Sequence, residues 1–191
     1  MRTGDILVVA SSEKGRELLL DLLKSSGNRQ IVTASSGNQA RRLFNQNNFE
    51  TVLINTPLPD EFGDELALFA IDTTAAGVIL LVKSELAEAI SLKVEDYGVF
   101  VVEKPIGRTL FYQALKLVTA SRMRMLGLKK ENIKLQNKIE EIRLVDRAKC
   151  TLIQYLNMSE EQAHKYIEKQ AMDRRVSRKS IAEGILKTYE S

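Results

Sequence analysis

Short apolar runs alternate with amphipathic stretches over the first 120 residues. The segments with a strand pattern are Ile6–Val9, Gln30–Ala34, Thr51–Ile54, Val78–Val82 and Phe100–Val102. Near-continuous apolar strands that are separated by helices indicate a parallel sheet covered on both faces. Five strand–helix units in this length fit a flavodoxin-like, doubly wound α/β fold with a five-stranded parallel sheet. In such a sheet a functional site is expected at the carboxyl ends of the strands.

Two of the stretches between these strands have the spacing of amphipathic helices. They are Glu13–Ser25 and a segment near Asn38–Asn45. We expect their apolar faces to pack on the sheet through Leu18, Leu19, Leu22 and Leu23 in the first and Ala40, Leu43 and Phe44 in the second.

A long helix is predicted behind this region. Between Thr109 and about Lys149 the chain has no proline and one glycine, Gly127. Apolar residues recur there at the heptad spacing of a coiled coil, with one polar residue in the stripe. We expect the stripe to join two copies in a parallel homodimer; the alternative is a single amphipathic helix that lies on its own domain. The predicted dimerisation residues are Met125, Leu128, Asn132, Leu135, Ile139 and Ile142.

The last quarter of the chain shows three short helical patterns. The first covers roughly Arg147–Leu156, the second begins at a capping box of Ser159 and Gln162, and the third begins at Ser177. Helices of this size with short loops predict a small all-α three-helix bundle. The predicted domains are therefore 1–120 for the α/β domain, 121–146 for the coiled-coil helix and 147–191 for the bundle.

Charge divides the chain unevenly. Residues 1–120 carry 12 Lys and Arg against 15 Asp and Glu, a balance of −3, and residues 121–191 carry 16 against 10, a balance of +6. A basic rear module behind an acidic front module suggests that the rear binds a polyanion, although solvated helix faces explain the same charge.

Several classes of protein are disfavoured by composition. No apolar run approaches the ~18–20 residues that span a bilayer, and the start lacks the core of a signal peptide. The single cysteine, Cys150, cannot form an internal disulfide, which fits a reducing compartment. One histidine, His164, and no clustered carboxylates argue against a zinc site. We expect a cytoplasmic protein that neither crosses a membrane nor holds a metal or cofactor.

The front region resembles the receiver domains of response regulators. The segment Asn55–Gly63 is similar to the one that follows the third strand in that family, and Lys104-Pro105 matches the pair after the fifth strand. The resemblance implies that Asn55 stands where the family has its phosphoryl-accepting aspartate. It likewise places Ala10 and Ser11 at the positions of the Mg²⁺-binding acidic pair, and Val82 at that of the switch hydroxyl.

Of these functional positions only Lys104 keeps the family's residue type. A neutral amide is a poor nucleophile toward a phosphoryl donor, and Mg²⁺ needs hard oxygen ligands, preferably carboxylates. Asp60 and Glu61 lie just beyond as possible substitutes, but the sequence offers them no metal partners. We therefore interpret the front region as a pseudo-receiver with a degenerate site.

The rear region resembles the ANTAR domain of transcription antiterminators. The motifs that carry the resemblance are Asp146–Lys149, Met158–Ala163, Ala171–Arg175, Ser177 and Ile181-Ala182. The resemblance spans about 45 residues and implies an RNA-binding domain that recognises hairpin loops and so prevents formation of a terminator.

Basic residues of this region are suited to RNA phosphates and to bases splayed from a loop. Tyr155 and Tyr166 fall near the apolar stripes, so we expect them to pack in the core rather than to stack on bases. The predicted RNA-binding residues are Arg147, Lys149, Arg174, Arg175, Arg178 and Lys179.

The sequence thus predicts an RNA-binding transcription antiterminator that acts as a dimer on hairpins of nascent RNA. Its control would come from a regulatory protein partner or a ligand, independently of aspartate phosphorylation. The rival interpretation is a DNA-binding or protein-interaction response regulator, but the residues after Ala182 are too few for a turn and a recognition helix. No glycine-rich phosphate loop or catalytic triad pattern is present, so an enzyme is not expected.

Overall fold

The computed structural model describes residues 5–24 and 30–189. The chain divides into two compact units, Met1–Leu126 and Gly127–Ser191. Within the described ranges, no helix has the length and apolar character needed to cross a membrane.

The first unit is built on a five-stranded parallel sheet. Its strands are β1 Asp5–Ala10, β2 Ile31–Ala34, β3 Phe49–Asn55, β4 Gly77–Lys83 and β5 Phe100–Lys104. They are arranged in the order β2-β1-β3-β4-β5, and every neighbouring pair is parallel. The flavodoxin-like, doubly wound fold predicted from the hydrophobic pattern is confirmed.

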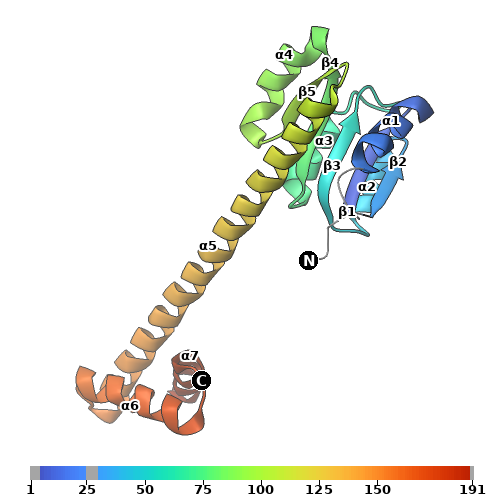
Figure 1. The fold of residues 1–191 in the computed structure, drawn as a ribbon. Helices are drawn as coiled ribbons and strands as arrows, with labels where there is room; N and C mark the ends of the chain where they lie inside the picture. Colours follow the sequence, from blue (N-terminus) through green and yellow to red (C-terminus); the bar gives the residue numbers. More distant parts are fainter. Residues whose placement is uncertain (1–4, 25–29, 190–191) are drawn as a thin grey trace. The chain divides into compact units, whose positions relative to one another are not determined.

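Helices cover both faces of this sheet (Figure 1). One face carries α1 and the first turns of α5, and the other carries α2, α3 and α4. Their bounds are α1 Glu13–Lys24, α2 Gly37–Phe44, α3 Asp64–Thr73, α4 Ser84–Val94 and α5 Arg108–Leu156, with a 3₁₀ turn η1 at Glu95–Tyr97.

Two hydrophobic cores follow from the alternation of side chains along the strands. Ile54 and Leu80 point toward α2, α3 and α4, whereas Leu53 and Ile79 point toward α1 and α5. Leu18 was expected to face inward, but it is exposed, because its three leucine neighbours Leu19, Leu22 and Leu23 already define the buried face of α1. The expected end of this helix at Ser25 lies outside the described residues.

The long helix α5 continues without a break from Arg108 to Leu156. The sequence suggested a separate first bundle helix at Arg147–Leu156, but that segment is the last part of α5. No proline or glycine lies between Gly127 and Leu156 to end the helix. The bundle core accordingly begins at Val145 of α5.

The second unit packs the end of α5 against α6 Glu160–Arg174 and α7 Arg178–Tyr189. The predicted capping box is present: the Ser159 side chain accepts from the Gln162 backbone, and the Gln162 side chain accepts from the Ser159 backbone. The core of the bundle consists of Val145, Ala148, Leu152, Ala163, Ile167, Ala171, Ile181, Ala182, Ile185 and Leu186. The three-helix architecture predicted for the rear region is confirmed.

Gly77 allows α5 to pack closely on the sheet. A Cβ atom at this position would lie 2.2 Å from Cγ1 of Val118, a residue of α5 that is buried against the sheet. We expect Gly77→Ala to lower the stability of the first unit by about 1–3 kcal/mol because the core has no room for the added methyl group.

Calorimetric unfolding of the full chain measures this effect, and Gly127→Ala is the matched control. A Cβ atom at Gly127 meets nothing within 4 Å. Because alanine is the better helix former, the control should gain about 0.5–1 kcal/mol. Equal stability of the Gly77→Ala variant and the wild type would contradict the close packing.

Candidate functional site: the receiver edge and the basic bundle

The carboxyl ends of β1, β3 and β5 bring together Ala10, Asn55 and Lys104. Ala10 and Asn55 are direct partners in the β1–β3 register. The Asn55 amide lies against α1, since a Cβ atom at Gly15 would be 2.5 Å from its Nδ2. The Ser11 hydroxyl donates to the carbonyl oxygen of Pro57 at 3.1 Å. The side chains of Ala10, Ser11 and Asn55, at the ends of β1 and β3, are therefore neutral, and the serine faces a backbone carbonyl.

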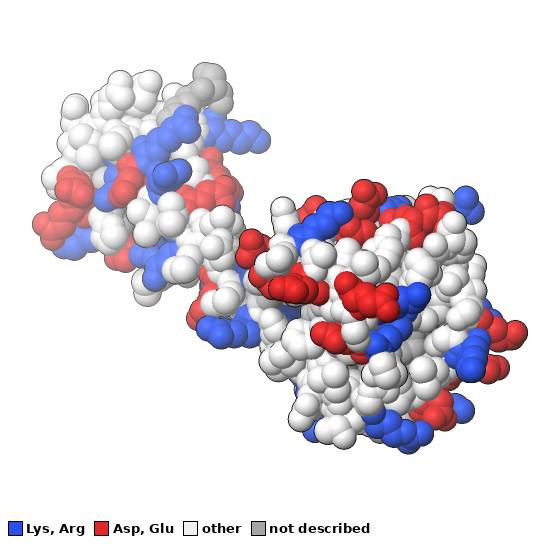
Figure 2. Space-filling view, turned by 90° about the horizontal axis from the view of Figure 1, so that it is seen from above, with Lys and Arg blue, Asp and Glu red and all other residues white. Residues whose placement is uncertain are grey.

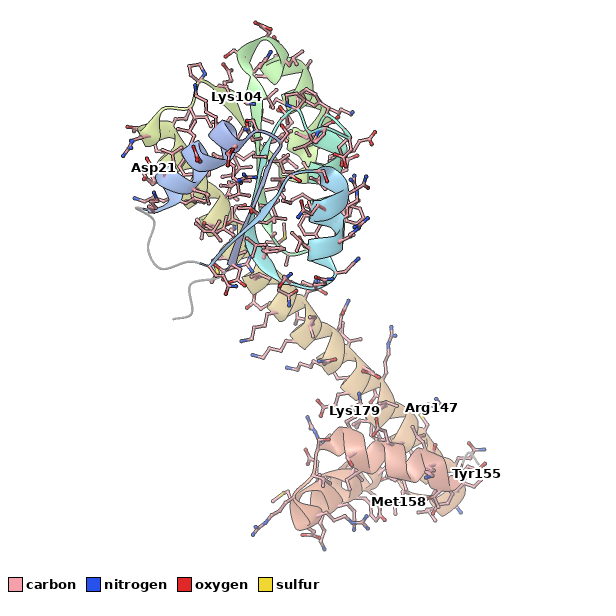
Figure 3. The ribbon with its side chains drawn as sticks, turned by 90° about the vertical axis from the view of Figure 1, so that its right-hand side faces the viewer. Asp21, Lys104, Arg147, Tyr155, Met158 and Lys179 are labelled. Atoms are coloured by element: carbon pink, nitrogen blue, oxygen red, sulfur yellow. The ribbon has the colours of Figure 1, made fainter. Side chains whose placement is uncertain are left out.

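Lys104 is held by the backbone rather than by a carboxylate. Its Nζ donates to the carbonyl oxygen of Thr56, in the loop after β3. Burial, and then the positive charge of Lys83, hold the pKa of Lys104 below its ordinary value. Figure 3 labels Lys104 within the first unit. Among the described residues, the interactions of this lysine are therefore with a backbone carbonyl and a second lysine, and none is with a carboxylate.

Lys83 is a residue of this edge that sequence analysis did not single out. It is the register partner of Lys104 across the β4–β5 pair, and it is exposed. Val82, which the resemblance placed at the switch-hydroxyl position, is fully buried in the core on the other face of the sheet. Period-two alternation along β4 was the available signal, because Lys83 follows Ile79 and Leu81 on one face.

Asp60 and Glu61 are both engaged with α2. The Asp60 carboxylate accepts from the backbone N–H groups of Gly37 and Asn38, each at 2.9 Å. Both hydrogen bonds hold the pKa of Asp60 below its ordinary value, and the one from the Asn38 backbone has the larger effect. Glu61 forms a bidentate ion pair with Arg41. Across the described parts of the chain, no group of three or more His, Cys, Asp or Glu side chains is placed to hold a metal ion.

Introducing the missing carboxylate alone should not create a phosphorylation site. We expect Asn55→Asp to remain unmodified by acetyl phosphate and Mg²⁺, because Ala10 and Ser11 supply no carboxylates for the metal. Intact-mass spectrometry checks this result, with the triple variant Ala10→Asp/Ser11→Asp/Asn55→Asp as the comparison. Phosphoryl transfer to the single variant or to the wild type would contradict it.

Three of the six predicted RNA-binding residues are paired with acids inside the bundle. Lys149 Nζ lies 2.8 Å from Asp146 Oδ1 and 3.2 Å from Glu160 Oε1, and these carboxylates, Asp146 first, raise the pKa of the lysine. Arg178 lies 3.7 Å from Glu141 and 3.6 Å from Glu168, and Lys179 lies 3.1 Å from Glu140. The positive charge expected from the sequence is therefore largely neutralised at these positions.

Arg174 and Arg175 differ from that group. Both are exposed at the end of α6, where Arg175 has a left-handed backbone conformation with φ of 54° and caps the helix. Neither guanidinium group has an ion-pair partner among residues 5–24 and 30–189. Arg147, labelled in Figure 3, is also exposed, on α5. Within the predicted set, Arg174 and Arg175 thus carry exposed positive charge that no acid of the described residues neutralises.

The tyrosines of the bundle lie at its surface. Tyr155 is 54% exposed and Tyr166 is 38% exposed, so the expectation that they pack in the core was wrong. The core is filled instead by smaller aliphatic residues one position away, such as Ile167. The rings of Tyr155 and Tyr189 lie 5.3 Å apart at an interplanar angle of 31°. Exposed aromatic faces of this kind can stack on nucleic-acid bases.

The predicted dimerisation stripe is exposed along α5. Five apolar residues of the stripe have half or more of their surface in solvent, and Asn132 is exposed between them. A run of large apolar side chains on a helix favours burial against a second element. The five apolar residues are Met125, Leu128, Leu135, Ile139 and Ile142.

Comparison with known proteins finds a family match in the second unit. Residues 134–186 match the ANTAR domain family, and this range contains most of the second compact unit. The chain is also 24% identical to the transcriptional regulatory protein PdtaR of Mycobacterium tuberculosis over 183 residues, which is 96% of this chain and 89% of that protein. The chain thus combines a unit that has the fold of receiver domains with a region that matches the ANTAR domain family.

Solved receiver domains share the fold of the first unit of this chain. The signal receiver domain of an HD domain-containing protein from Pseudomonas fluorescens Pf-5 has a TM-score of 0.60 and 21% identity, covering 66% of this chain and 94% of that chain. The response regulator TrrA of Thermotoga maritima, solved in complex with Mg²⁺ and BeF, has a TM-score of 0.53 and 26% identity, covering 61% and 99%. The relative PdtaR is named as a transcriptional regulatory protein.

Proposed function

We propose that this ANTAR regulator is a cytoplasmic, RNA-binding transcription antiterminator that acts as a dimer on hairpins of nascent RNA. The observation that carries the proposal is the coincidence of the ANTAR match with a bundle that presents Arg174 and Arg175 without ion-pair partners in the described chain. Arginine binds phosphates and also stacks on, or hydrogen-bonds to, bases that leave a loop. Such bases are the usual targets of sequence-specific RNA recognition.

The proposed mechanism is competition between two RNA structures. Two bundles, joined through the α5 stripe, bind a pair of hairpins more tightly than one bundle binds either hairpin, because the second contact is intramolecular. Binding stabilises the hairpin pair by mass action. The overlapping terminator stem then forms less often, and transcription continues.

The receiver fold of this chain acts, in the proposal, as a pseudo-receiver. Asn55 supplies no acceptor carboxylate, and the nearby Asp60 and Glu61 carboxylates are engaged with α2. Control by a protein partner fits the exposed apolar side chains of this unit, such as Leu92 on α4, which is 70% exposed. On the face of the receiver fold seen in Figure 2, basic and acidic residues are interspersed with uncharged ones, and no continuous positive area favours RNA there.

Parallel selection from RNA and DNA tests this function. The full chain is offered a library of hairpin pairs with randomised loops and a library of duplex DNA of matched charge. We expect enrichment of specific RNA loops and an RNA preference that persists across a salt series. Enrichment of duplex DNA would favour the DNA-binding regulator, and absence of enrichment in both libraries would favour the protein-interaction regulator.

A further inference from the structure

Two hollows on the surface of the bundle differ in how their charged side chains are paired. The first, which we name the ion-pair hollow, has a volume of about 170 Å³, and its charged lining is Lys138, Glu141, Asp146, Lys149 and Arg178, with His164 beside them. The second, which we name the tyrosine groove, has a volume of about 500 Å³. No Asp or Glu is among the described residues that line the groove. Its polar lining is Tyr166, Gln170, Arg174, Ser180, Thr188 and Tyr189.

The ion pairs of the ion-pair hollow make Lys149 and Arg178 poorly suited to bind RNA. Lys149 and Arg178 each contact two carboxylates there or at its rim. Exposed ion pairs of this type are weak, about 0–1 kcal/mol, so an RNA phosphate can break them. The carboxylates would nevertheless stay beside the phosphate and repel it. Lys149 and Arg178 therefore add little net attraction for a polyanion.

The tyrosine groove has the chemistry that single-stranded bases require. Tyr166 and Arg174 come from α6, eight residues apart on one helix face, and Tyr189 comes from α7. The Gln170 amide, between them on α6, offers both a donor and an acceptor to the edge of a base. Leu152 and Ile185 form an apolar floor. Aromatic rings above an apolar floor, with one unpaired arginine, match the stacking sites of single-stranded nucleic acid.

The groove and the paired cations occupy different parts of the bundle. Lys179 is paired with Glu140, whereas Tyr155 lies fifteen residues further along α5, about 22 Å at the helical rise. Figure 3 places Lys179 and Tyr155 toward opposite ends of the bundle. Tyr155 stacks on Tyr189 and so extends the aromatic surface beyond the groove.

We propose that the tyrosine groove is the base-reading site of the ANTAR domain, and that it takes unstacked bases of a single-stranded RNA loop between Tyr166 and Tyr189, with Arg174 at its rim. This inference rests on the proposed RNA-binding function. It moves the reading surface away from Lys149, Arg178 and Lys179, where the sequence placed half of the predicted contacts.

Fluorescence titration of a selected hairpin pair with 2-aminopurine in its loop tests the groove. We expect Tyr166→Ala to weaken binding by about ten-fold or more and to abolish the loop fluorescence change, because one base loses its stacking partner. Tyr166→Phe keeps the ring and should stay within about two-fold of the wild type. Tyr97→Ala removes an exposed tyrosine of the receiver fold and should have no effect.

The Glu141→Gln variant distinguishes RNA binding in the tyrosine groove from RNA binding in the other hollow. Removing a carboxylate from the ion-pair hollow should leave the RNA affinity within about two-fold of the wild type if RNA binds in the groove. Stronger binding by Glu141→Gln together with unchanged binding by Tyr166→Ala would overturn this inference while leaving RNA binding intact. Failure of the wild type to bind any RNA would instead overturn the proposed function, and circular dichroism excludes loss of the bundle fold in each variant.

Discussion

Replacing Leu128 and Leu135 by lysine is expected to convert the protein to a monomer and to weaken binding of a two-hairpin RNA by about 100-fold or more. Both leucines lie at one core position of the heptad stripe, and both are more than half exposed on the single chain. In a parallel pair of helices the four lysines would face one another across the seam, where unpaired charges are strongly disfavoured. The loss of affinity follows because the second hairpin contact ceases to be intramolecular.

Sedimentation equilibrium and RNA titration measure the two effects separately. Ile133→Lys is the matched control, since Ile133 is an exposed apolar residue of α5 that lies off the stripe. The control should remain a dimer with unchanged affinity. A wild type that is monomeric at micromolar concentration, or a double lysine variant that still dimerises, would mean that the exposed stripe has another role.

Replacing Arg174 and Arg175 by alanine is expected to weaken RNA binding by at least ten-fold. If each arginine contacts a phosphate of single-stranded RNA, the slope of log affinity against log salt should fall in magnitude by about 0.7 for each. Both side chains are exposed, so the variant should fold normally. The measurement is a titration at several salt concentrations.

Removal of two positive charges elsewhere provides the control for this experiment. Lys129 and Lys130 are exposed on α5, and Lys129→Ala/Lys130→Ala changes the net charge by the same amount. We expect this variant to lose much less affinity and to keep the salt slope. If both double variants weaken binding equally, the arginines act through net charge alone and not as contacts.

Hydrophobic spacing was sufficient to predict the architecture of this chain. The apolar strands, the helices between them and the capping box at Ser159 each depend on residues close in sequence. Helix ends were harder to predict. The start of the bundle lies inside α5, where the helix continues without a break. No local sequence signal marks this point, because the only change is that α5 begins to bury side chains in the bundle core at Val145.

The binding residues were predicted less well because their state depends on distant partners. Lys179 and Glu140 are 39 positions apart, so their pairing appears only once α7 packs beside α5. Tyr155 and Tyr166 lie close to the buried faces of their helices, and a rotation of one position decides between core and surface. The alternation of side chains along β4 predicts that Lys83 lies beside Lys104 at the end of the sheet, but the resemblance to receiver domains points to its neighbour Val82.

Single-round transcription in vitro tests the central claim most directly. The template carries a selected hairpin pair whose second stem overlaps an intrinsic terminator, and the purified full chain is added at increasing concentration. We predict that read-through rises with protein, requires the loop bases, and is lost in Arg174→Ala/Arg175→Ala and in Leu128→Lys/Leu135→Lys. Unchanged termination at protein concentrations that saturate the hairpins would contradict the antiterminator function.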